Sequence, residues 1–291
     1  MKKTVVGLVV SLGLVSLLAG CGQAKLTTSK TNYHQNGMVA VVKGTTNKKA
    51  HLSYQIDQGA MHKTSVREGT YVVQVPTTTK QQTVTLKAKT GSKAIEKKAT
   101  VAAGTAVGQY QAIADKYNQA VIGMALSKAD QAKAQSLQKQ AAAAKAGQLA
   151  PAQLMALQQT QKDVQAAMQQ AKTAKKAQLL PAKSADGVHQ LVKTDNVVIR
   201  GAIADQDVMG LTLIAPIKAL KDKAALKEFG TSFALLAQST GADSKKVMSE
   251  FSKFTKKNKK SNQTTMKTIT SNGVKFNTGF SASHLYIYIT K

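Results

Sequence analysis

The chain has 291 residues, a formal net charge of +27, one cysteine and no tryptophan. It is longer than a single small β-sandwich and long enough for two or more domains. The single cysteine excludes an intramolecular disulfide, a thiolate metal cluster and a CxxC redox pair. A chain this basic is attracted to polyanions, which include nucleic acid, anionic lipid headgroups and anionic wall polymers.

Residues 1–20 have the pattern of a secretory signal peptide. Lys2 and Lys3 precede an apolar run from Val5 to Leu18, and small residues follow directly. The run is shorter than the ~20 residues that a membrane-spanning helix needs. We therefore expect a cleaved signal peptide and no permanent membrane span here.

The tetrapeptide Leu18-Ala19-Gly20-Cys21 resembles the lipobox of bacterial lipoproteins. The resemblance implies diacylglycerol on the Cys21 sulfur and cleavage of the chain before this residue. It also implies anchoring on the extracytoplasmic face of the cell membrane, with a Gram-positive type of envelope favoured; the alternative is an unmodified thiol. An exported protein rarely meets nucleic acid, so the expected polyanions are wall polymers or lipid headgroups.

Residues 21–36 are polar and rich in Thr and Lys, which indicates a lipidated tether. In residues 37–104, apolar and polar residues alternate in short runs separated by glycines. This pattern predicts an antiparallel β-sandwich. The stretch from Arg67 to Val73, which contains Glu-Gly-Thr-Tyr, resembles the approach to a late strand in bacterial immunoglobulin-like modules. The absence of tryptophan and of a cysteine pair distinguishes it from antibody domains.

Residues 105–180 are rich in Ala, Gln and Lys, which favour helix. Two narrow apolar stripes flank a break from Gly147 to Pro151, and they consist of Tyr110, Ile113, Tyr117, Val121 and Met124, then Leu154, Leu157, Val164 and Met168. Narrow stripes are typical of helices that pack on one another. The segment is predicted to be a helical hairpin that acts as a spacer; a further helix starting near Ser127 is an open alternative.

Residues 181–291 mix both periodicities. Strands are expected at 197–203, 208–214, 266–270, 274–277 and 283–289, with two helices in the middle. Asp222 and Asp243 are the expected N-caps, and the first helix should bury Leu226, Phe229, Phe233 and Leu236. This order indicates an α+β domain. The predicted fold is thus multidomain: an all-β Ig-like sandwich, an α-helical hairpin spacer and an α+β domain.

The sequence contains no recognisable catalytic motif. HExxH, GxSxG, a P-loop and a GxGxxG in a suitable setting are all missing, and the histidines are scattered. No metal or cofactor is therefore expected. Asp205 and Asp207 suit an acid–base pair or a cation site, but a polar turn between strands is the favoured interpretation. We predict a non-enzymatic envelope protein; a solute-binding lipoprotein of a transporter and an envelope foldase or enzyme are the competing interpretations.

Two candidate binding surfaces lie in the last segment. A helix starting near Ser244 has an apolar stripe of Val247, Phe251 and Phe254 opposite many lysines. The stripe is expected to pack in the domain core, leaving the basic face for anionic polymers or headgroups through Lys253, Lys256 and Lys257. In the terminal strand, one face carries an imidazole and two phenols that could stack on sugar rings, namely His284, Tyr286 and Tyr288. The alternative is that another element covers this face.

Overall fold

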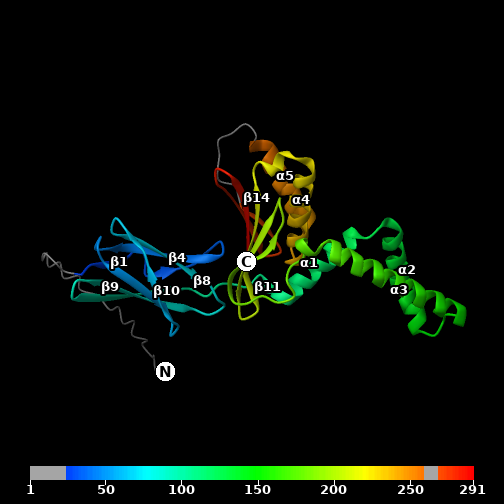
Figure 1. Cartoon of the computed structure of the whole chain (residues 1–291), viewed down its shortest axis with the longest axis horizontal. Helices are drawn as coiled ribbons and strands as arrows, with labels where there is room; N and C mark the ends of the chain where they lie inside the picture. The colour runs from blue at the N-terminus through cyan, green and yellow to red at the C-terminus, as the bar shows by residue number, and fades with distance from the viewer. Residues whose placement is uncertain (1–23, 259–267) are drawn as a thin grey trace, which may run out of the picture.

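The computed structural model describes residues 24–258 and 268–291; the expected signal peptide and Cys21 lie outside these ranges. Three parts follow one another in space: a β-sandwich, a central α+β domain and a projecting helical arm (Figure 1). Within the described residues there are three β-sheets and five α-helices. The chain is therefore a mixed, multidomain protein, as the sequence predicts at this coarse level.

The sandwich consists of ten strands. They are β1 Leu26–Thr28, β2 Asn32–Tyr33, β3 Gln35–Asn36, β4 Val39–Thr46, β5 His51–Ile56, β6 Met61–Thr64, β7 Val66–Arg67, β8 Thr70–Pro76, β9 Gln82–Thr90 and β10 Lys93–Val101. One sheet has the order β1–β4–β8–β7, with β3 beside β4, and the other β2–β10–β9–β5–β6. The segment 21–36, expected to be a tether, differs from that expectation because it carries strands from Leu26 onward. These strands are too short for an alternating pattern to reveal them.

Alternation of apolar and polar residues forms the core of the sandwich. In β8 the side chains of Tyr71, Val73 and Val75 are buried, while the residues between them face solvent. They pack against Leu52 and Leu86 of the other sheet. Successive side chains of a strand point to opposite faces, so this period of two allows one face to join the core.

The central domain is built on one sheet and three helices. Its elements are β11 Gly108–Gln109, α1 Tyr110–Ala125, β12 Gly187–Lys193, β13 Val198–Ala204, β14 Asp207–Pro216, α4 Lys223–Ser239, α5 Ser244–Asn258, β15 Ile269–Ser271, β16 Val274–Phe280 and β17 His284–Thr290. The sheet order is β12–β13–β14–β17–β16–β15, with β11 beside β14. Two 3-10 turns, Lys176–Gln178 and Ala219–Lys221, lie between these elements.

One face of this sheet is covered by helices. Ile199, Leu213 and Ile287 of the sheet share a buried cluster with Phe233 of α4 and Val247 of α5. The predicted stripe of α4 is right at three of its four positions, but Leu226 is 50% exposed. Leu226 lies in the first turn of α4, near the N-cap Asp222, at the edge of the helical layer.

Local signals place the ends of these elements as predicted. The Asp222 side chain accepts a hydrogen bond from the Ala225 amide, and the Asp243 carboxylate accepts one from the Lys246 amide. Asp205 and Gln206 have φ angles of 52° and 67° and form the tight turn between β13 and β14. The favoured interpretation of Asp205 and Asp207 as part of a turn is therefore confirmed.

The helical segment differs from the predicted single hairpin and agrees with the open alternative of a further helix near Ser127, whose hydroxyl accepts a hydrogen bond from the Asp130 amide. Tyr110, Ile113 and Tyr117 of α1 are buried in the core of the central domain. Only α2 Lys128–Lys145 and α3 Pro151–Ala174 form the projecting hairpin, with Gly147 at positive φ in the turn between them. An apolar stripe does not reveal its partner: α1 packs on α4 and not on α3 alone.

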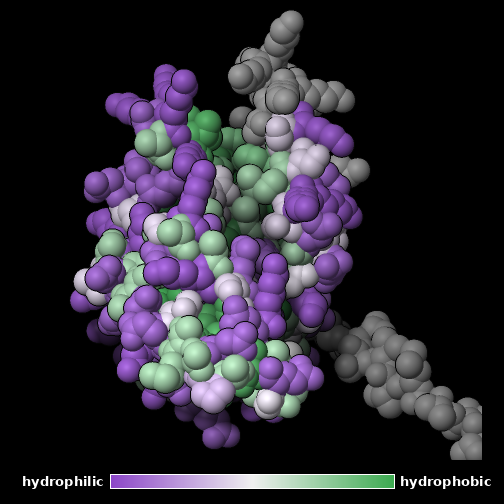
Figure 2. All heavy atoms as spheres, turned by 90° about the vertical axis from the view of Figure 1, so that its right-hand side faces the viewer, coloured by the Kyte–Doolittle hydropathy of each residue, from purple (hydrophilic) through white to green (hydrophobic). Residues whose placement is uncertain are grey.

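The arm is exposed on most of its surface. In α3 only Val164 and Ala171 are buried. Seen from the side of the arm, the molecule presents mostly hydrophilic residues with scattered weakly apolar ones (Figure 2). Within the described ranges, no helix is long and apolar enough to cross a membrane.

Tyr117 allows a test of the central core. Burial raises the pKa of this phenol from 10.0 to about 12. A hydrogen bond with Ser232 lowers the pKa by less than burial raises it, and the charge of Glu228 adds a smaller increase. The core holds the neutral phenol, so its contribution to stability is complete below pH 10 and is lost as the pH rises through about 12.

We predict that the free energy of unfolding of Tyr117→Phe falls less between pH 10 and 12 than that of the wild type, by on the order of 2 kcal/mol. Urea denaturation at a series of pH values measures this difference. Equal pH slopes for the two proteins would contradict the burial of a neutral phenol.

Candidate functional site

The outer face of the central sheet carries a row of polar side chains. Arg200 of β13 pairs with Thr212 of β14, Thr212 with Tyr288 of β17, and Tyr288 with Asn277 of β16. The residues next to them in sequence face the helical core, so these four share the opposite face. The row lies on the side of the sheet away from α1, α4 and α5.

The sandwich is docked on one end of this outer face. Gln35 donates hydrogen bonds through Nε2 to the carbonyl of Met209 at 2.7 Å and to that of Gly37 at 2.9 Å. Met38 packs against a small apolar cluster of Ala202, Ala204 and Met209. The β3–β4 hairpin thus covers one end of the face, and within the row Arg200 is exposed while Tyr288 and Asn277 are half-buried.

Gly37 fits both its turn and this contact. Its φ is +68°, and a Cβ added there would lie 3.2 Å from Cδ1 of Tyr288. A residue with a side chain would be strained at this φ and would press on the tyrosine ring. The backbone of the hairpin can therefore approach the ring closely.

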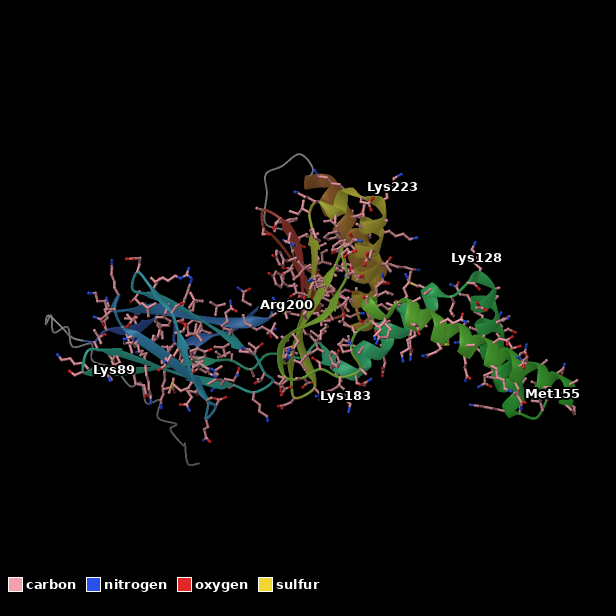
Figure 3. All side chains as sticks on the ribbon, viewed as in Figure 1. Lys89, Lys128, Met155, Lys183, Arg200 and Lys223 are labelled. Carbon is pink, nitrogen blue, oxygen red and sulfur yellow. The ribbon has the colours of Figure 1, made fainter. Side chains whose placement is uncertain are left out.

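A cleft of about 530 Å³ lies where the two parts meet. Its lining comes from Asn36, Gly37, Met38, Val39 and Gln74 of the sandwich and from Val188, Arg200, Asn277 and Tyr288 of the sheet. Figure 3 marks Arg200 at this junction. None of these lining residues is acidic, so among the described residues the cleft offers cationic, amide and aromatic groups.

Arg200 is exposed, and no hydrogen bond or ion pair from the described residues holds its guanidinium. Only two of the 41 basic residues of the chain are arginines, Arg67 and Arg200. A guanidinium offers a planar fork that matches carboxylate or phosphate, whereas lysine offers a point charge. The side chain at the mouth of the cleft is thus suited to an anionic ligand.

The three residues predicted on the terminal strand lie in a series along β17, and only Tyr288 lines the cleft together with Arg200. The rings of Tyr286 and Tyr288 are nearly parallel, with centroids 6.1 Å apart and an interplanar angle of 8°. His284 extends the series, with its ring centroid 6.2 Å from that of Tyr286. Burial, and then the neighbouring Tyr286, raise the pKa of Tyr288, so the phenol stays neutral and can donate a hydrogen bond.

Thr212 lies between Arg200 and Tyr288 in the row. It is 2% exposed, and its hydroxyl has no hydrogen-bond partner among the described residues. An unpaired buried hydroxyl costs about 1–3 kcal/mol.

Lys253, one of the lysines predicted on α5, belongs to another surface. Val247 is fully buried and the ring of Phe251 lies 5.2 Å from that of Phe233, so the helix packs in the core as favoured. Lys253 is exposed, and the side chains of Phe254, Lys256 and Lys257 lie outside the described part of the helix. Because α5 covers the inner face of the sheet, Lys253 and the tyrosines lie on opposite sides.

Sequence reasoning missed Arg200, Asn277 and Thr212. The scarcity of arginine was a signal that could have singled out Arg200, whereas Asn277 and Thr212 join the site only through strand pairing. Over residues 24–258 and 268–291, no group of three His, Cys, Asp or Glu side chains is placed to hold a metal ion. No family model matches this chain, and no curated protein matches it.

The docking of the hairpin can be tested with two glycines. We predict that Gly37→Val loosens the sandwich from the central domain, because its side chain meets Tyr288. Gly91→Val is the matched control, since Gly91 has φ +61° and open space around it. Both changes place a β-carbon at positive φ, which destabilises each variant by about 1–2 kcal/mol.

Small-angle X-ray scattering should give a broader distance distribution for Gly37→Val than for Gly91→Val. Identical profiles for the two variants would mean that the hairpin contact does not hold the two parts together.

Proposed function

We propose that this protein is a lipid-anchored, extracytoplasmic protein of a bacterial envelope, with a Gram-positive type favoured, and that it binds an anionic wall polymer without catalysing a reaction. The observation that carries the binding proposal is the unpaired Arg200, which lines one cleft with Tyr288, a ring that lies parallel to that of Tyr286. The anchor rests on the lipobox-like sequence that ends at Cys21.

The strand order supports an immunoglobulin-like identity for the sandwich. In such domains, strands A, B, E and D form one sheet and strands C, F and G the other. Here β1, β4, β8 and β7 follow the first order, and β5, β9 and β10 the second. The sandwich then acts as a rigid module between the anchor and the binding cleft.

The chemistry of the cleft favours a charged glycan or sugar-phosphate chain. The apolar face of a sugar ring can lie on Tyr286 and Tyr288, and an acidic group can take the guanidinium of Arg200. The amide of Asn277 can bond to ring hydroxyls. The high positive charge of the whole chain raises the local concentration of any such polyanion.

The shape of the cleft favours a polymer over a small solute. Sites for small ligands usually enclose most of the ligand surface, whereas Arg200 is exposed at the mouth of this cleft. A solute-binding lipoprotein is therefore the weaker alternative. Since no carboxylate lines the described cleft, general acid–base catalysis there lacks its usual groups.

The anchor is tested by Cys21→Ser. We predict that this variant accumulates as an unlipidated precursor or is released into the medium, because the only thiol of the chain is gone. Cell fractionation followed by mass spectrometry shows where the variant is found and whether it carries lipid. A variant that stays in the membrane fraction after a high-salt wash, with unchanged mass, would contradict lipidation.

The binding site is tested by Arg200→Gln, with Arg67→Gln as a control of equal charge change. A hydrogen bond to a charged group contributes about 1.5–3 kcal/mol. We therefore predict roughly ten- to hundredfold weaker binding of Arg200→Gln to purified walls that carry teichoic acid, with partial recovery in Arg200→Lys.

Walls stripped of teichoic acid serve as the second control and should bind the wild type weakly. If both arginine variants lose the same affinity, the binding is diffuse and the cleft is not the site.

A further inference from the structure

The end of the sandwich away from the central domain gathers several loops. β4 runs from the docked hairpin at Val39 to Thr46, and β1 begins beside it because Leu26 pairs with Thr46. Thr45 pairs with Thr70, and His51 pairs with Lys89, so the β7–β8 and β9–β10 turns lie at this same end. Figure 3 marks Lys89 there, opposite to the arm. We call this region the distal end.

The distal end is strongly basic. Its carboxylates, Glu68 and Glu96, are each paired, with Lys48 at 2.7 Å and with Lys87 at 3.3 Å. A groove of about 820 Å³ is lined there by Lys48, Lys49, Lys63, Lys87 and Lys89, among other residues. Three more basic residues, Lys25, Arg67 and Lys93, lie at the same end of the sandwich.

Three groove lysines have no carboxylate partner in the described residues, namely Lys49, Lys63 and Lys89. All three are exposed. Like charges gathered in this way repel one another, and a bound anion relieves that repulsion. The groove therefore complements a negatively charged surface.

The start of the described chain is fixed to this same end. The Lys25 amide donates to Oδ1 of Asn47 at 2.6 Å, and the Thr46 hydroxyl donates to the Lys25 carbonyl at 2.7 Å. Three residues separate Lys25 from Cys21, and the four steps between these two residues span at most roughly 14 Å. A lipid on Cys21 would hold the distal end within about two Debye lengths of the bilayer.

We propose that the distal end binds the anionic headgroups of the membrane that holds the lipid anchor, as a second membrane contact beside the lipid. This inference rests on the proposed anchor at Cys21. The sandwich then stands end-on at the bilayer, and the eight residues of β4 raise the cleft by about 25 Å. Arg200 and the arm face away from the membrane, toward the wall.

Vesicle binding of unlipidated protein tests this contact separately from the anchor. The chain from Gly22 onward keeps every described residue and has no cysteine. We expect it to co-sediment with vesicles of phosphatidylcholine and phosphatidylglycerol, and not with pure phosphatidylcholine. A basic residue near an anionic surface contributes about a factor of five to binding. A triple variant should therefore bind the anionic vesicles about 100-fold more weakly; it carries Lys49→Gln, Lys63→Gln and Lys89→Gln.

The matched control removes three exposed lysines of α2, with Lys128→Gln, Lys139→Gln and Lys145→Gln. This triple variant has the same net charge and should bind the vesicles like the wild type. Equal losses in both triple variants, or binding that ignores phosphatidylglycerol, would overturn the proposal. Binding of the groove lysines to walls with teichoic acid, but not to these vesicles, would overturn it as well.

Orientation gives an independent readout. A fluorophore on Ser92→Cys lies in the β9–β10 turn, and one on Gln148→Cys lies in the turn of the arm. Nitroxide-labelled headgroups should quench the first and not the second. Equal quenching at both positions would exclude an end-on sandwich. If Cys21→Ser in cells contradicts the proposed lipidation, the vesicle results with unlipidated protein still stand, so the two proposals can fail separately.

Discussion

The contact of the β3–β4 hairpin with the outer face of the central sheet determines how the protein can work. Gln35 joins the two parts through two backbone carbonyls, and Gly37 brings the hairpin backbone onto the ring of Tyr288. Because the hairpin covers only one end of the face, it turns an open sheet into a cleft. It also aligns β4 so that the other end of the sandwich points away from the central domain.

The division of the central sheet into two faces follows from the same arrangement. Helices cover the inner face, where Phe233 and Val247 pack on the strands. That packing holds β13, β14 and β17 in register, and the register places Arg200, Thr212 and Tyr288 in a row. The inner core is thus what positions the polar row, although none of its residues touches the cleft.

The sequence predicted those features that depend on local periodicity and capping. Alternation in β8 and β17 and the caps at Asp222 and Asp243 are visible because each signal lies within a few residues. The role of α1 was not visible, since its stripe of Tyr110, Ile113 and Tyr117 fits any apolar partner. The short strands before Gly37 carry too few residues for a period, and they form because β4 and β10 supply partners.

Some residues of the candidate site could also be predicted from local periodicity, and others depend on long-range strand pairing. The tyrosines of β17 share a face by simple alternation, so they could be selected in advance. Arg200 and Asn277 join them only because β13 and β16 lie on either side of β14 and β17, which is a long-range property of the sheet. The cleft itself needs the docked sandwich, for which the sequence holds no local signal.

The claim that Arg200 takes the acidic group of a wall polymer can be observed directly, because the chain has only two arginines. Protein labelled with ¹⁵N-arginine gives two guanidinium Nε–H signals in an NMR spectrum, one from Arg67 and one from Arg200. On titration with purified teichoic acid at physiological salt, the signal of Arg200 should shift and saturate. An unchanged Arg200 signal at saturating polymer would contradict the proposed site.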